Sequence, residues 1–305
     1  MSTNTPESTL PESNTPESNV PALPFRDADI ATLIVAKRRL EQPSLTAQIS
    51  DLVGSPIESL MRRLPKNMHE RVDSVVQAAL LSSLNIAVNS LQTGSQLPAL
   101  PAASAGDDGA EDTPEPAHPA ARDGFHRLLG AGTGAVGGIF GVWALSVELP
   151  VSTALILRSI ADIARSEGHA LDSLEVRLAC LEVFALGGRS KRDNSAESGY
   201  WLVRAGLAKT IADAATHLAQ HGMAAGSAPP LVRLVAAISA RFGSSVTAQA
   251  AVKALPVVSA VTGGAINVLF MNHFQEMAHG HFAIRRLEAR YGRAAVEARY
   301  KELKV

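Results

Sequence analysis

An uncharged, glycine-rich run of 20 residues, Leu128 to Val147, constrains the fold more than any other part of the chain. As a single helix it has about the length that crosses the hydrocarbon core of a bilayer. Gly130, Gly134, Gly137 and Gly141 recur every three to four residues, so they share one face of such a helix. Each glycine costs a helix interior about 1 kcal/mol relative to alanine, which indicates that another backbone packs closely against this face.

A second uncharged run covers residues 254–272 and contains the pair Gly263 and Gly264. We expect these glycines to face the first glycine stripe, so that the two runs form the central helical hairpin of the fold. Small residues at this spacing support helix association in membranes, and soluble helices also use glycine for close crossings. The pattern leaves two alternatives open, a shallow membrane-inserted hairpin and a soluble core.

The first run also contains Gly132, Gly134 and Gly137 at the GxGxxG spacing of a dinucleotide-binding fingerprint. That fingerprint requires a β-strand before the first glycine. Residues 121–127, which precede the run, are neither β-branched nor alternating. We therefore expect no nucleotide at this position.

The chain divides into four segments by composition. Residues 1–25 repeat Pro, Ser, Thr and Glu with a period of five, which predicts a disordered arm. Residues 26–92 carry helical patterns that are too few for an independent core, so we expect them to pack on the later helices. Residues 93–123 read as an acidic disordered linker, and residues 124–305 as the helical core. The arm does not resemble a secretory signal, so the expected location is cytoplasmic.

Composition narrows the fold class and the partners. The sequence has only three Tyr and two Trp beside abundant Ala and Leu, which favours an all-α, multi-helix bundle. In residues 1–25 and 93–123 the acidic residues outnumber the basic ones by eight. Because the whole chain has a net charge of −1, the remaining residues carry a net charge of about +7. That charge favours anionic surfaces such as phospholipid headgroups. No dense Lys/Arg cluster with interleaved aromatics is present, so we expect no nucleic acid.

Local signals place the helices of the bundle. Ser55-Pro56-Ile57-Glu58 resembles a capping box with proline at the first helical position. The single cysteine, Cys180, lies in an apolar stretch, which predicts a core side chain and excludes a disulfide within the chain. Further helices are expected at about 66–91, 151–166, from the cap at 172–175 to the glycines at 187–188, 197–221, and from 229 to a stop at 241–243.

Two sets of polar residues on the last long helix are candidates for chemistry. His273, Glu276 and His279 form H-x-x-E-x-x-H, whose histidines are six residues apart, whereas zinc-binding helices space them by four. We expect this set to form a wet face without a metal. Asn267, His281 and Arg285 fall on the opposite face with small and aromatic neighbours, which predicts burial and therefore partners.

Glu148, at the end of the first glycine stripe, is one expected partner of these buried groups. Arg158 and Asp162 on the following helix, and Arg204 on a later one, complete the candidate polar or ligand site. Arg158, Asp162 and Arg165 equally suit a solvated face with a weak ion pair. A structural polar network and a ligand or headgroup site remain the two interpretations of the whole set, and the sequence identifies no cofactor.

Several of these pieces together resemble one family. They are Glu148-Leu-Pro150, Leu157-Arg158, Arg177 with Glu182-Val-Phe-Ala185, Ser198-Gly-Tyr200 with Arg204, Pro256-Val-Val, Gly263-Gly-Ala-Ile-Asn267, and Gly280-His-Phe282 with Arg285-Arg-Leu-Glu288. In this order the residues resemble the EcsC protein family from about residue 50 to the C-terminus, apart from the acidic linker. The resemblance implies an all-helical bacterial protein and a context beside an ABC transporter, and it implies no particular reaction.

Two functional classes remain open on the residues and the resemblance. The first is a membrane-associated helical accessory or interaction protein, linked to an ABC transporter or secretion system and held at the inner face of the cell membrane by a lipid or a membrane protein. The alternative is a hydrolase-like enzyme, with or without a metal, that uses His281 with Glu148 or Asp162. The sequence contains no G-x-S-x-G and no Cys/His signature for a nucleophile, so we favour the first class.

Overall fold

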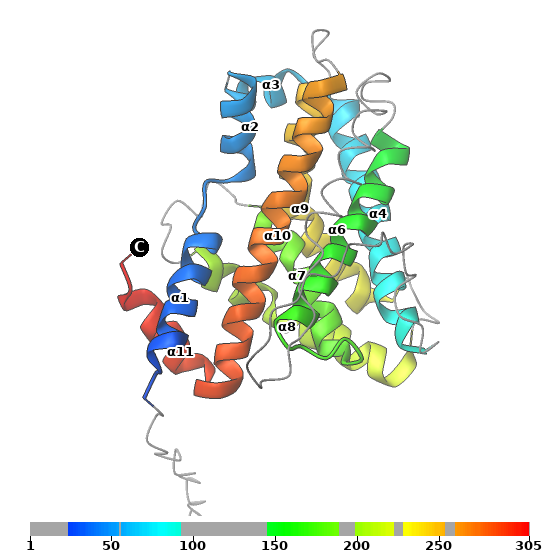
Figure 1. Ribbon diagram of the computed structural model, residues 1–305. Helices are drawn as coiled ribbons and strands as arrows, with labels where there is room; N and C mark the ends of the chain where they lie inside the picture. The colour runs from blue at the N-terminus through cyan, green and yellow to red at the C-terminus, as the bar shows by residue number, and fades with distance from the viewer. Residues whose placement is uncertain are drawn as a thin grey trace, which may run out of the picture.

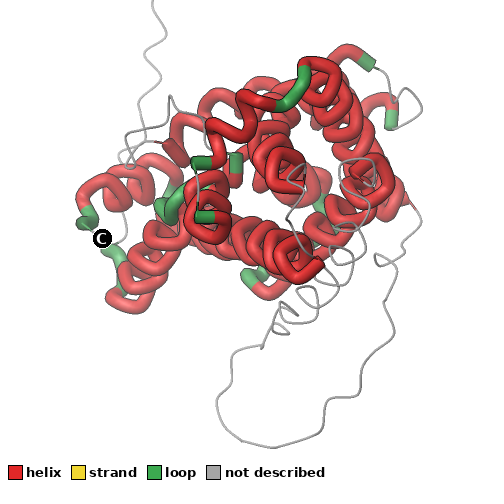
Figure 2. Tube along the Cα trace, turned by 90° about the horizontal axis from the view of Figure 1, so that it is seen from above, coloured by secondary structure: helices red, strands yellow, loops and turns green. Residues whose placement is uncertain are grey.

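The computed structural model describes residues 24–54, 56–92, 145–188, 199–222, 228–253 and 260–304. This part of the chain forms ten helices and no strand (Figures 1 and 2). The helices are α1 Asp27–Leu40, α2 Leu45–Val53, α3 Ile57–Arg63, α4 Lys66–Gln92, α6 Leu145–Ser166, α7 Leu174–Gly187, α8 Gly199–His221, α9 Pro229–Lys253, α10 Ala260–Tyr291 and α11 Arg293–Glu302. The predicted all-α fold is confirmed.

Helix α10 runs from one end of the bundle to the other, and most of the other helices pack around it (Figure 1). With 32 residues at about 1.5 Å of rise each, it is roughly 48 Å long. Helices α1 and α2 cover one side of it, while α6 and α7 cover the other. The polar residues of α10 therefore meet different neighbouring helices at different points along its length.

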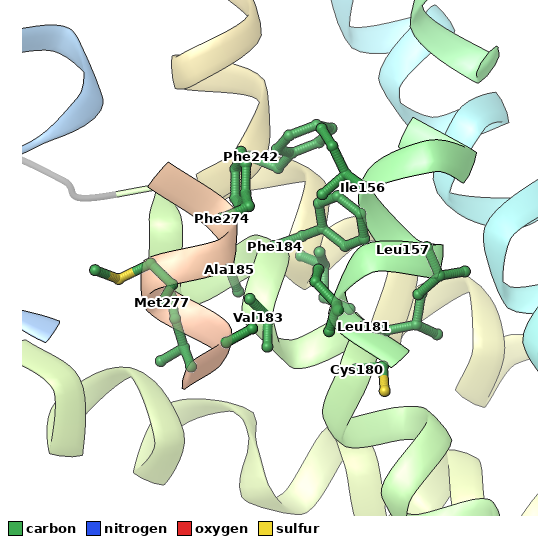
Figure 3. Close-up of a cluster of buried hydrophobic side chains, with 14 of the residues drawn as sticks. Ile156, Leu157, Cys180, Leu181, Val183, Phe184, Ala185, Phe242, Phe274 and Met277 are labelled. Atoms are coloured by element: carbon green, nitrogen blue, oxygen red, sulfur yellow. The ribbon is translucent and has the colours of Figure 1, made fainter. Parts of the chain in front are cut away.

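The interior is built on α7 and three phenylalanines. Eleven of the 14 residues of α7 are buried, which is typical of a helix surrounded by others. Phe184 of α7 lies 5.0 Å from Phe242 of α9 and 5.5 Å from Phe274 of α10 between ring centroids (Figure 3). Cys180 is buried in the same core, as predicted, and burial raises the pKa of its thiol to about 12.

Close approach at glycine does occur, but at positions other than those predicted. A Cβ on Gly280 of α10 would lie 2.7 Å from Leu40 Cγ and 3.1 Å from the Ala36 carbonyl oxygen, so α1 crosses α10 closely there. A Cβ on Gly187 of α7 would likewise overlap the Phe274 ring of α10. Gly130, Gly134, Gly137 and Gly141 lie outside the described residues, and the proposed hairpin between the uncharged runs therefore stays a prediction. Gly263 and Gly264 lie in the first turns of α10, which continues through them.

Three predicted helix ends were wrong. Helix α9 continues for ten residues beyond Gly243, because residues 245–253 are all buried and the helix satisfies their backbone hydrogen bonds. Helix α6 includes Pro150 instead of beginning after it, since burial of Glu148 and Leu149 outweighs one lost backbone hydrogen bond. At α3, Pro56 is the N-cap residue, and the first N–H donates to Ser50 Oγ at 3.1 Å.

Candidate functional site

Four buried polar residues meet where α6, α9 and α10 come together at one end of the bundle, and we call them the upper cluster: Glu148, Gln249, Lys253 and Asn267. Lys253 Nζ lies 2.6 Å from both carboxylate oxygens of Glu148. Asn267 Nδ2 donates to Glu148 Oε1 at 3.0 Å, and Gln249 Nε2 donates to Asn267 Oδ1 at 2.6 Å. The side chain of Lys253 is 0% exposed and that of Glu148 is 7% exposed, so this ion pair is withdrawn from water.

The upper cluster ties together the chain positions at which the two uncharged runs join the described bundle. Glu148 follows the first run directly, and Lys253 directly precedes the second. A cavity of about 10 Å³ borders Gln249 and Asn267, and it has room for about one water molecule. The donors and acceptors therefore satisfy one another, which is the arrangement of a structural polar network.

A second group of polar residues, buried except for the half-buried Glu288, lies near the other end of α10, and we call it the lower cluster: Glu182, Tyr200, Arg204, His281 and Glu288. The hydroxyl of Tyr200 is 3.1 Å from His281 Nδ1. On the other side of the ring, His281 Nε2 is 3.7 Å from Glu182 Oε2, which is too long for a hydrogen bond. Among the described residues Nε2 has no hydrogen-bond partner.

The protonation of the lower cluster is set by its burial. Burial lowers the pKa of His281 well below its usual value, and the positive charges of Arg204 and Arg285 lower it further. Burial raises the pKa of Glu182, although the same two arginines oppose that change. Burial therefore shifts both groups toward their uncharged forms.

Arg204 holds the edge of the lower cluster through a two-pronged ion pair. Its terminal nitrogens donate to the two carboxylate oxygens of Glu288 at 2.6 and 2.9 Å. The guanidinium carbon lies 5.4 Å from the Tyr200 ring centroid and 5.3 Å from that of Trp201. This planar geometry, with stacking on aromatic rings, is the one in which arginine pairs most strongly with a carboxylate.

The residues predicted to form one candidate site therefore divide among several places. Glu148 and Asn267 belong to the upper cluster, as the predicted contact between them requires, whereas His281 and Arg204 belong to the lower one. Arg285 is half-buried and pairs with Glu175 at the surface. Asp162 pairs with Arg165 at 3.0 Å on the outside of α6, which suits the solvated-face interpretation. Arg158 is half-buried on the same helix.

Sequence reasoning missed several partners of these residues. Lys253 and Gln249 lie on the part of α9 that the predicted stop at Gly243 had excluded. Burial of Glu182 could have been predicted from the sequence, because it is a lone carboxylate in the apolar stretch 178–187. Glu288 stands out in the sequence only through the family resemblance, because its contact with Arg204 joins residues 84 positions apart.

The prediction that His273, Glu276 and His279 form a solvent-exposed face of α10 is wrong for His273. His273 is 3% exposed, and its Nε2 lies 2.9 Å from the Gly187 carbonyl oxygen. The reason is that α2 and α7 cover this part of α10, which the wheel alone does not show. Glu276 and His279 are partly exposed and pair with Arg39 and Glu167. The described residues contain no group of three or more His, Cys, Asp or Glu that could hold a metal ion.

One described helix, α9, has the length and hydropathy of a membrane span. Its apolar window is 61% buried inside the bundle, and a core helix of a soluble protein has the same properties.

Comparison with known proteins identifies the family but no near relative. No curated protein and no solved structure gives a significant match. The model of the EcsC protein family matches residues 29–287, which cover most of the chain and contain the upper cluster and all of the lower cluster except Glu288. The chain therefore belongs to the EcsC protein family.

Proposed function

We propose that this protein is a membrane-associated helical accessory protein that contacts anionic lipid at the inner face of the cell membrane. The observation that carries the proposal is a basic corner formed by α3 and the start of α4. Residues 59–69, which lie between Glu58 and Glu70, contain Arg62, Arg63 and Lys66 and no acidic residue, and all three cations are exposed. Anionic lipid attracts each such cation by about 1 kcal/mol near the surface.

The position of this corner supports the proposal. It lies at the end of the bundle where α6 and α10 begin and α9 ends (Figure 1). The first uncharged run ends in the first turn of α6, and the second extends from residue 254 into α10. Leu52 of α2, near the same corner, is 47% exposed and adds an apolar side chain to it. Cationic and apolar groups at one end of a molecule suit a membrane interface.

The experiment is sedimentation of the full chain with vesicles of phosphatidylcholine, with and without phosphatidylglycerol. We expect binding to the anionic vesicles that weakens with added salt. Neutralising the corner with Arg62→Gln, Arg63→Gln and Lys66→Gln should weaken it by up to about 100-fold, because three cations contribute about 1 kcal/mol each.

A matched control removes three exposed cations elsewhere, with Arg38→Gln, Lys209→Gln and Arg233→Gln. The proposal predicts that this variant binds much more tightly than the corner variant. Equal losses in both would mean that only net charge matters, and the corner would not be a docking surface. A carbonate wash of cell membranes then separates insertion of the uncharged runs from peripheral contact.

On this proposal a membrane-protein partner, such as an ABC transporter or a secretion component, would meet the protein at the same end. The hydrolase alternative gains no support from the described structure, because His281 is 0% exposed and lies too deep to contact a substrate.

A further inference from the structure

A hollow on the surface of α10 lies between α1 and the end of α6, away from both polar clusters. Helices α1 and α6 flank α10 on opposite sides there, as Figure 1 shows. The hollow has a volume of about 310 Å³, which is at the lower end of the range for small-molecule sites. Its lining includes Thr32, Val35, Arg39, Glu167, His279 and Ala283.

One end of the hollow is cationic. Arg39 of α1 lines it and pairs through Nε with Glu276 Oε2 at 3.0 Å. The Arg39 side chain is still 33% exposed, so its terminal amino groups can reach a ligand in the hollow. Two parallel N–H donors of this kind match a carboxylate or a phosphate.

The other end of the hollow is anionic. Glu167, directly after α6, has one carboxylate oxygen 3.6 Å from His279 Nδ1 and the other 3.1 Å from Arg286 Nη2. Burial alone would raise the pKa of Glu167, but His279 and Arg286 outweigh it and hold the pKa below its usual value. Glu167 is therefore ionised at neutral pH and can accept hydrogen bonds from an ammonium group.

Helix geometry orders the groups that line the hollow. Arg39 is anchored at Glu276, whereas Glu167 is anchored at His279 and Arg286, which lie three and ten residues farther along α10. These offsets correspond to rises of about 4.5 and 15 Å. Val35 and Ala283 also line the hollow and offer apolar contact, and Val35 is 46% exposed.

We propose that this hollow binds a small zwitterion, with a phosphate or carboxylate at Arg39 and a primary ammonium at Glu167. A spacer of two or three carbons between the two charges would lie against Val35 and Ala283. Phosphoethanolamine has this chemistry, either as the free molecule or as the headgroup of a phospholipid. The inference does not depend on the basic corner, which lies on other helices.

The test is isothermal titration calorimetry, in which the full chain is titrated separately with phosphoethanolamine, ethanolamine and inorganic phosphate. A ligand of this size should bind with a dissociation constant of about 1 mM or tighter. We expect Arg39→Gln and Glu167→Gln each to weaken phosphoethanolamine binding by about tenfold or more, because each removes one charged contact. Arg38→Gln changes the neighbouring exposed arginine, which does not line the hollow, and should leave binding unchanged.

Vesicles containing phosphatidylethanolamine or phosphatidylcholine identify the source of the ligand. If the protein is retained only on phosphatidylethanolamine vesicles, and Arg39→Gln abolishes this retention, the ligand is the phospholipid headgroup. If the protein binds free phosphoethanolamine but is not retained on vesicles, the ligand is the soluble molecule. Both results support the zwitterion site. Ethanolamine or phosphate binding as tightly as phosphoethanolamine, or no saturable binding at about 10 mM, would overturn it. The corner variant should keep its phosphoethanolamine affinity, so this inference and the proposed function fail separately.

Discussion

The upper and lower clusters each bury a glutamate against α10, and the two glutamates have opposite surroundings. Glu148 has a lysine nitrogen at 2.6 Å and an asparagine amide at 3.0 Å. Glu182 lies 3.7 Å from the neutral ring of His281, and burial raises its pKa. The two buried carboxyl groups are therefore accommodated differently: Glu148 has a buried lysine in direct contact, whereas Glu182 has no cation within hydrogen-bond distance and its pKa is raised by burial.

The two halves of α10 are also held in place by different interactions. The first half is fixed by matched charges that join the ends of three helices. The second half is fixed by close backbone contact with α1 at Gly280 and by the Arg204–Glu288 pair at its edge. Variants of the two halves should therefore respond differently to loss of charge, to added volume and to pH.

Removal of the buried cation should have the largest effect. Lys253→Met leaves Glu148 without its partner, and we expect a loss of about 3–5 kcal/mol in the free energy of unfolding. Urea denaturation followed by circular dichroism measures it.

The double variant Glu148→Gln with Lys253→Met is the control. It removes both charges and keeps an oxygen to accept from Asn267, so it should recover at least half of the loss. A single variant that costs less than about 1 kcal/mol would contradict a desolvated ion pair at this end of α10.

Added volume at the α1 crossing should have the next largest effect. Gly280→Ala places a methyl group 2.7 Å from Leu40 Cγ and 3.1 Å from the Ala36 carbonyl oxygen. We expect about 1–3 kcal/mol of destabilisation in the same assay, because α1 must move away.

Gly243→Ala is the matched change on α9, where the new methyl group would have only a 3.5 Å contact with Asp73. It should be neutral or stabilise by up to about 1 kcal/mol, since alanine is the better helix former. If both variants behaved alike, helix propensity and not packing would decide the result, and the lower half of α10 would lack its close contact.

The pH dependence of stability should reveal the buried titratable groups of the lower cluster, Glu182 and His281. With a raised pKa, folded Glu182 keeps a proton that the unfolded chain releases above about 4.5, so this group costs stability as pH rises. With a lowered pKa, His281 costs stability as pH falls below about 6.5, where the unfolded chain takes up a proton. The two costs oppose each other between these values.

Glu182→Gln removes only the first cost. Its stability relative to wild type should be near zero at about pH 4 and increase with pH, by at most about 1.4 kcal/mol per pH unit. A Glu182→Gln variant that loses stability at neutral pH would mean that Glu182 is ionised and paired.

The sequence was sufficient for the all-α class and for most helix positions, because capping residues and apolar periodicity are local signals. It also indicated burial of Asn267 and His281 and the contact of Asn267 with Glu148. It failed where the outcome depends on contacts between distant segments. His273 is buried by α2 and α7, and Lys253 acquires its role only because α9 continues past Gly243. One helical wheel contains neither fact, so residues on a common face of α10 were assigned to one site although they contact different helices.

The smallest effect should come from Asp162, which the sequence placed in the candidate site. Its pair with Arg165 has a distance of 3.0 Å, close to that of Glu148 with Lys253, but the two side chains are 19% and 44% exposed. Water and salt screen such a pair, so Asp162→Asn should change the free energy of unfolding by less than about 0.5 kcal/mol. Asp213→Asn, which removes the exposed partner of Lys209, should behave the same way. A loss above about 1.5 kcal/mol for Asp162→Asn alone would place this carboxylate in a functional polar network with Arg158, and burial would then not be what separates strong from weak pairs in this bundle.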